Sequence, residues 1–179
     1  MLNHKDITAY STGSKLFHWL VAIIVIGMLA VSFFLVDLPK AYRPSAWLVH
    51  KSLGLTVLFL IIVRFVWIKY CGKPALPAAV PVWEKVLSRI VQYSFYVLLI
   101  AMPLCGWIMS MADNRIPSYF GLFNLALPGI KPNEALGNLM FQSHKAIAFI
   151  LIALIVLHVA GAIKHHFIDK DDVLRRMLP

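Results

Sequence analysis

Residues 142–164 read QSHKAIAFILIALIVLHVAGAIK, and this stretch decides the fold. It carries no acidic side chain and is long enough to cross the hydrocarbon core of a bilayer, which takes about 20 apolar residues. Two histidines, His144 and His158, interrupt it. Because an imidazole inside a membrane span is costly to desolvate, each of them is a candidate functional residue.

Three more apolar runs have the length of membrane helices, at 16–36, 46–68 and 90–111. The whole chain is 60% hydrophobic and 14% charged, with a mean hydropathy of +0.78, which is typical of an integral membrane protein. The sequence therefore predicts an all-α membrane four-helix bundle that forms one domain over residues 1–179. The longest loop is expected at 112–141. The first run is too long for the apolar core of a signal peptide, so we expect it to stay as a helix.

Lysine and arginine are distributed unevenly between the ends of these runs. With the N-terminus in the cytoplasm, eleven of the 17 basic residues, Lys5 among them, lie on the cytoplasmic side and six lie on the other. The positive-inside rule then predicts that both termini are cytoplasmic. The net charge of +9 surrounds the apolar runs and forms no single stripe, which argues against nucleic-acid binding.

The predicted topology sorts four histidines by depth. His18 begins the first span at the inner face, and His50 begins the second span at the outer face. The fourth span runs inward, so His144 is outer and His158 is inner. The expected pairs are therefore His18 with His158 and His50 with His144.

The fourth span contributes one histidine to each pair. His144 and His158 are 14 residues apart, which corresponds to about 21 Å along a helix axis. Fourteen steps return to within roughly 40° of the starting direction, so both imidazoles face the same side of the helix. Two centres bound in this way would lie one above the other across the membrane.

A small residue stands four positions after each histidine, on the same helical face. These residues are Ala22, Gly54, Ala148 and Ala162. Such positions leave room for a flat porphyrin beside its ligand, although small residues also serve close helix packing in membranes. Zinc would require a third ligand, and a proton relay would require carboxylates within the spans. Two b-type haems, each with two histidine ligands, fit the pattern best.

At these residues the chain resembles the bacterial cytochrome b561 family. The matching segments are Phe17-His18-Trp19-Leu20, His50-Lys51-Ser52-Leu53-Gly54, Ser143-His144-Lys145, His158 and the tail His165-His166-Phe167-Ile168-Asp169-Lys170-Asp171-Asp172. The resemblance implies the same ligand pairs as the depths do. It further implies a location in the bacterial inner membrane, electron exchange with ubiquinone, and superoxide as the electron donor on the periplasmic side.

Several charged residues have two interpretations each. Lys51 and Lys145 suit haem propionates or an anionic donor, and Arg43 and Arg115 suit attraction of an anion at the outer face. Arg64 either extends to the inner lipid headgroups, pairs with a propionate or lines a quinone cleft. His165 and His166 either anchor the inner end of the fourth span at the membrane surface or deliver protons to quinone.

Two other classes of protein remain open on the sequence. One is a cytochrome b anchor subunit that relays electrons for a separate periplasmic redox partner. The other is a transporter or structural bundle without haem. No acid–base pair or nucleophile is visible in the sequence, so an oxidoreductase role would depend on positioned cofactors and on no catalytic side chain.

Overall fold

The computed structural model of the protein describes residues 7–178, and Lys5 lies outside them. It contains four long helices: α1 (Thr12–Ser32), α2 (Arg43–Cys71), α3 (Val82–Ala112) and α4 (Glu134–Phe167). All four are long and apolar enough to cross a membrane. The prediction of an all-α membrane four-helix bundle is confirmed.

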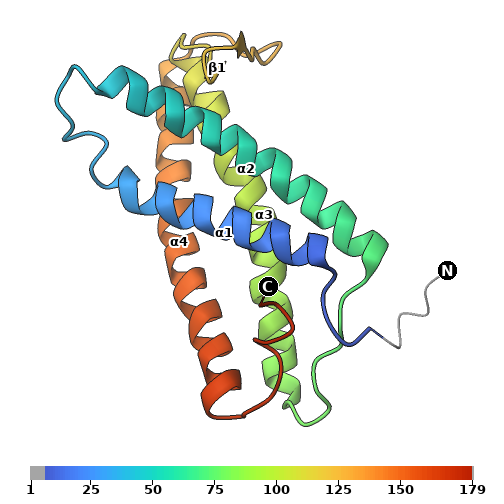
Figure 1. Ribbon diagram of the computed structural model, residues 1–179. Helices are drawn as coiled ribbons and strands as arrows, with labels where there is room; N and C mark the ends of the chain where they lie inside the picture. Colours follow the sequence, from blue (N-terminus) through green and yellow to red (C-terminus); the bar gives the residue numbers. More distant parts are fainter. Residues whose placement is uncertain (1–6, 179) are drawn as a thin grey trace.

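The helices are arranged as a bundle in which successive helices are packed against each other, and α3 and α4 run side by side along their length (Figure 1). Both described ends of the chain lie at the same end of the bundle. The Trp19 indole Nε1 donates to the Met177 carbonyl oxygen at 2.9 Å, and Lys15 Nζ donates to that of Leu178 at 2.6 Å. These contacts bind the C-terminal tail to the start of α1.

The helix ends differ from the predicted boundaries by one to eight residues, and the largest differences are at the starts of α3 and α4. α3 begins eight residues early, at Val82, through a polar segment that hydropathy does not detect. α4 begins at Glu134, where the Asn133 side chain accepts a hydrogen bond from the Leu136 N–H and caps the helix. α1 stops at Ser32, and the apolar run continues as turns that bury Leu35.

The predicted loop at 112–141 is therefore shorter and contains a small hairpin. Strands β1 (Ser118–Tyr119) and β2 (Phe123–Asn124) pair antiparallel. In Figure 1 the hairpin lies at the end of the bundle opposite the C-terminal tail. It thus covers the end at which α2 begins.

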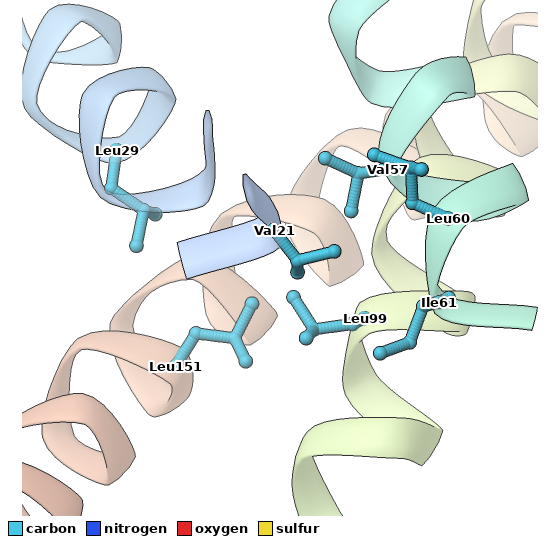
Figure 2. Packing of buried hydrophobic residues seen from close by; sticks show 7 residues of the cluster. All are labelled: Val21, Leu29, Val57, Leu60, Ile61, Leu99 and Leu151. Carbon is cyan, nitrogen blue, oxygen red and sulfur yellow. The ribbon is translucent and has the colours of Figure 1, made fainter. Parts of the chain in front are cut away.

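The buried core lies halfway along the bundle and draws on all four helices. Figure 2 shows its seven residues: Val21, Leu29, Val57, Leu60, Ile61, Leu99 and Leu151. Leu151 is fully buried, and it stands seven residues from both His144 and His158. Seven residues are about two helical turns, so an apolar layer separates the levels of these two histidines.

Gly13 in α1 packs directly against the Trp67 ring of α2. A Cβ at this position would lie 2.6 Å from Trp67 Cε2, which is too close for two carbon atoms. We expect Gly13→Ala to destabilise the bundle by about 1–3 kcal/mol, as overpacking does. Thermal unfolding of the purified protein measures the effect. Gly27→Ala is the matched control, since a Cβ at Gly27 meets nothing within 4 Å; equal unfolding midpoints for the two variants would contradict the prediction.

Candidate functional site

The first histidine pair lies toward the end of the bundle that carries the C-terminal tail. His18 of α1 and His158 of α4 have ring centroids 6.1 Å apart, at an interplanar angle of 63°. Aromatic rings border both imidazoles, since Trp19 is 5.3 Å from His18 and Phe95 of α3 is 5.6 Å from His158, centroid to centroid. The structure thus brings together the two residues that the sequence assigned to the inner level.

The second pair lies beyond the apolar layer, toward the hairpin. His50 of α2 and His144 of α4 have ring centroids 6.3 Å apart, at an interplanar angle of 60°. His144 Nδ1 lies 2.9 Å from the carbonyl oxygen of Met102 in α3. Because a carbonyl oxygen can only accept, Nδ1 carries the proton and donates it, and this leaves Nε2 free to ligate a metal.

Gly106 of α3 lies against the His144 ring, and its lack of a side chain leaves room for that ring. A Cβ at Gly106 would lie 3.3 Å from His144 Cε1 and 3.4 Å from Nδ1, so any side chain there would press on the imidazole. Sequence analysis did not assign a ligand-positioning role to Gly106 or Met102. The only sequence signal is a glycine within an apolar span, which does not identify its neighbour on another helix.

The separation of the rings fits a shared metal ion. A metal–imidazole bond is about 2 Å long and the ring centroid lies about 1 Å behind the ligating nitrogen, so two opposed imidazoles on one metal have centroids about 6 Å apart. Both pairs have this separation. Within residues 7–178, no protein hydrogen bond engages the imidazoles of His18, His50 or His158, so their nitrogens are free as ligands.

Each pair bridges helices that are not closely packed against one another. α1 packs on α2, α2 on α3 and α3 on α4, whereas α1–α4 and α2–α4 are not among the well-packed pairs of the described chain. There is also free space beside Gly54, four residues after His50, since a Cβ there would meet only Met28 Cε, at 3.9 Å. A planar group coordinated by either pair would therefore extend between helices along small side chains.

The basic residues at the hairpin end form hydrogen bonds with the protein itself or are exposed. Lys51 Nζ donates to Ser110 Oγ at 2.7 Å, and the Ser110 hydroxyl donates to the Arg115 carbonyl oxygen. The Arg43 Nε donates to the Leu38 carbonyl oxygen at 2.8 Å. Lys145 is exposed on α4. The Lys51 ammonium thus binds the start of the hairpin loop to α2, a structural contact that sequence analysis did not anticipate.

Ser52 is the second contact between α2 and the hairpin, and it is fully buried. Its Oγ accepts a hydrogen bond from the Phe120 N–H at 2.8 Å and donates to the Leu48 carbonyl oxygen at 2.8 Å. The Tyr119 hydroxyl lies 3.1 Å from Thr56 Oγ1, one turn further along α2. The hairpin is therefore held beside the helix that carries His50.

Removal of the Ser52 hydroxyl should loosen the hairpin. We expect Ser52→Ala to cost about 0.5–1.5 kcal/mol, because the Phe120 N–H loses its hydrogen-bond partner. Hydrogen–deuterium exchange should become faster over residues 118–124. Ser143→Ala is the control, since the Ser143 hydroxyl donates only to Leu139 within α4. Unchanged exchange at the hairpin would show that Ser52 does not hold it.

Arg64 occupies the same end of the bundle as the first histidine pair. Its Nη1 donates to the Ser14 carbonyl oxygen at 3.3 Å, and no carboxylate pairs with it among residues 7–178. Tyr10 lies nearby, and burial raises the pKa of its phenol while the Arg64 charge opposes that rise. The guanidinium is thus a largely buried cation without an anionic protein partner.

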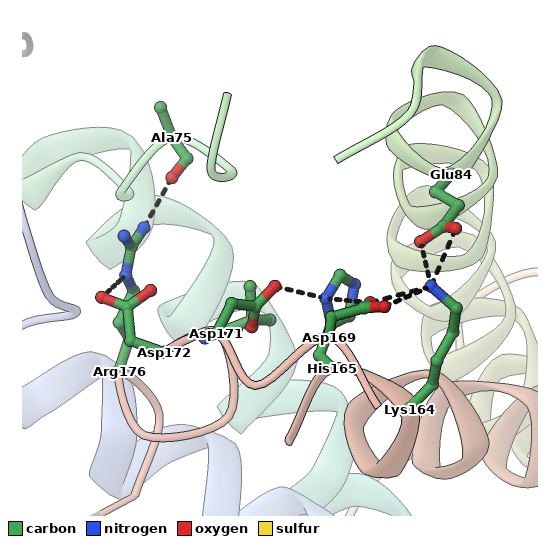
Figure 3. Close-up of polar contacts among 9 residues, drawn as sticks. Ala75, Glu84, Lys164, His165, Asp169, Asp171, Asp172 and Arg176 are labelled. Atoms are coloured by element: carbon green, nitrogen blue, oxygen red, sulfur yellow. Dashed lines mark hydrogen bonds and ion pairs between the residues drawn. The ribbon is translucent and has the colours of Figure 1, made fainter. Parts of the chain in front are cut away.

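His165 belongs to an ion-pair network that fastens the C-terminal tail (Figure 3). Its Nδ1 lies 2.7 Å from Asp171 Oδ2. Lys164 Nζ lies 2.9 Å from Glu84 Oε1 of α3 and 2.8 Å from Asp169 Oδ2. Glu84, His165 and Asp169 are close enough to resemble a metal site, but the Lys164 ammonium already forms ion pairs with both carboxylates. The neighbouring His166 Nδ1 is buried without a hydrogen-bond partner among the described residues.

Comparison with known proteins agrees with this architecture. The model of the prokaryotic cytochrome b561 family matches residues 9–179. The chain is 34% identical to cytochrome b561 homolog 2 of Escherichia coli K12, over 94% of this chain and 90% of that protein. It is 28% identical to the probable superoxide oxidase CybB of Yersinia pestis, over 98% of this chain and 97% of the relative. The chain therefore belongs to the prokaryotic cytochrome b561 family of b-haem inner-membrane electron-transfer proteins.

Proposed function

We propose that the protein binds two b-type haems and transfers electrons from a periplasmic donor to ubiquinone. One haem would be ligated by His18 and His158, and the other by His50 and His144. The observation that carries this proposal is the spacing of both imidazole pairs, 6.1 and 6.3 Å between centroids. When bound between two histidines, each haem would supply an iron centre that takes up and gives away one electron at a time.

The protein side chains would act by positioning and by excluding water. The hydrogen bond from His144 Nδ1 to the Met102 carbonyl oxygen fixes the ring and leaves Nε2 as the nitrogen that would ligate the iron, as outer-shell partners of metal-bound histidines do. The apolar layer around Leu151 keeps water out of the space between the two levels. Arg64, a cation without a carboxylate partner, would bind a propionate of the inner haem or the carbonyl oxygen of a quinone.

Superoxide is the donor that the relatives favour, because the Yersinia pestis relative is named a probable superoxide oxidase. The reaction balances as follows: two superoxide ions give up one electron each and leave as oxygen, and one ubiquinone takes both electrons and two protons. The hairpin end of the bundle carries Arg43, Arg115 and Lys145. Their positive charge would raise the rate at which a small anion encounters this end. With both termini in the cytoplasm, this half would face the periplasm, whereas His165 and His166 would lie on the cytoplasmic side.

The test uses the purified full-length protein in detergent. A reduced-minus-oxidised spectrum should show a b-type alpha band, and haem analysis should give about two haems per chain. Stopped-flow mixing with superoxide should then reduce the haem, and a short-chain ubiquinone should reoxidise it. Absence of the band would reject haem binding. A normal band without reaction with superoxide would instead favour an anchor subunit that serves a separate periplasmic redox protein.

A further inference from the structure

A pocket of about 330 Å³ opens where α2 ends and α3 runs beside it. It lies at the end of the bundle that carries the C-terminal tail. Six of its lining residues are Phe65, Lys69, Lys73, Gln92, Tyr93 and Tyr96. The pocket therefore combines aromatic walls with two ammonium groups and an amide.

The charge of this pocket is entirely positive. None of its lining residues is acidic, and within residues 7–178 neither Lys69 nor Lys73 belongs to an ion pair. Lys73 Nζ lies 3.5 Å from Gln92 Oε1, and Lys69 Nζ lies 5.5 Å from the centroid of the Phe65 ring. Both ammonium groups are thus held over the pocket with donor capacity left for an anion.

An apolar groove continues from the pocket along the outer face of α3. Its volume is about 560 Å³, and it shares Tyr93 with the pocket. Val86, Ile90 and Val97 line it, each about half exposed or more, and Arg89 adds a third basic side chain at its inner end. The groove runs from the polar start of α3 into the part of the helix that is apolar enough to cross a membrane, so its Val97 end faces the lipid chains.

We propose that the pocket and the groove together form a binding site for one anionic phospholipid. The phosphodiester would bind between Lys69 and Lys73, and one acyl chain would follow the groove from Tyr93 to Val97, toward the middle of the membrane. Basic pockets between membrane helices bind anionic headgroups in this way. An uncharged amphiphile, whether quinone or zwitterionic lipid, would leave two ammonium groups without a counter-charge. This site is separate from the histidine pairs, so its existence does not depend on the function proposed above.

The test is native mass spectrometry of the full-length haem-loaded protein, delipidated and then titrated with lipid. Phosphatidylglycerol should bind at one site about tenfold more tightly than phosphatidylcholine with the same acyl chains. The double variant Lys69→Gln/Lys73→Gln should lose that preference. The matched double variant Lys40→Gln/Lys131→Gln changes two exposed lysines outside the pocket and should keep it. Absorption spectra of both variants check that they fold.

Further measurements distinguish a lipid headgroup from a free phosphate ion as the group that binds between the lysines. Val97→Asn, which alters the groove and no charge, should weaken phosphatidylglycerol binding while inorganic phosphate fails to compete. Competition by millimolar inorganic phosphate, with no effect of Val97→Asn, would identify a free-anion site and overturn the lipid assignment. Equal affinity for the two lipids would do the same. Displacement of phosphatidylglycerol by a short-chain ubiquinone from both the protein and the lysine double variant would show that the pocket is a quinone site.

Discussion

Replacing His158 with alanine is expected to remove one haem per chain and to leave the other. No other histidine of the described residues could replace His158 as a ligand at this level. The only imidazole that faces it is that of its own partner His18, with ring centroids 6.1 Å apart. A b-type haem that loses one axial histidine loses its low-spin ligand field, and with it most of its affinity. The haem content of the purified variant should fall from about two to about one per chain.

The surviving haem identifies the pair that remains. Its spectrum should be that of an intact bis-histidine centre, because His50 and His144 lie beyond the apolar layer around Leu151 and share no side chain with the first pair. His166→Ala is the matched control, since His166 lies on the same helix but faces no other histidine of the described chain. Loss of both haems, or of neither, would contradict the pairing.

The parts of the fold that follow from hydropathy were predictable from the sequence. Four apolar runs long enough to cross a bilayer must form helices there, because the backbone N–H and C=O groups find no water to bond. The alternating direction of these helices then sorts the histidines into two levels. The juxtaposition of His18 with His158 and of His50 with His144 follows from depth alone. Their role as haem ligands stays a prediction until haem is measured.

Helix ends and contacts between distant segments were not predictable in this way. The first turns of α3 and α4 are polar, and ion pairs and a side-chain cap stabilise them, so a hydropathy profile places their starts too late. Lys51 was predicted to serve a haem propionate or an anionic donor, and nothing in the local sequence shows that Ser110 accepts its hydrogen bond. His165 likewise gains its partners from a tail that folds back on the bundle.

The second large effect is expected at Gly106, which is not a ligand. Gly106→Val should displace the His144 ring, because even the first side-chain carbon would lie 3.3 Å from His144 Cε1 and a branched side chain would come closer still. The ring would then lose its hydrogen bond to the Met102 carbonyl oxygen, which fixes its orientation and leaves Nε2 as the free nitrogen. Outer-shell changes of this kind typically cost 10- to about 100-fold in metal affinity.

The expected result is loss of the haem between His50 and His144, with the haem between His18 and His158 retained. Haem analysis and the reduced-minus-oxidised spectrum distinguish this outcome from general unfolding, which would remove both. Gly27→Val supplies the control, because a Cβ at Gly27 meets nothing within 4 Å. Retention of both haems in Gly106→Val would mean that the ring can shift without losing its metal. Since Gly106 touches His144 and neither His18 nor His158, selective loss would show that a backbone position on α3 determines ligation at a site whose ligands come from α2 and α4.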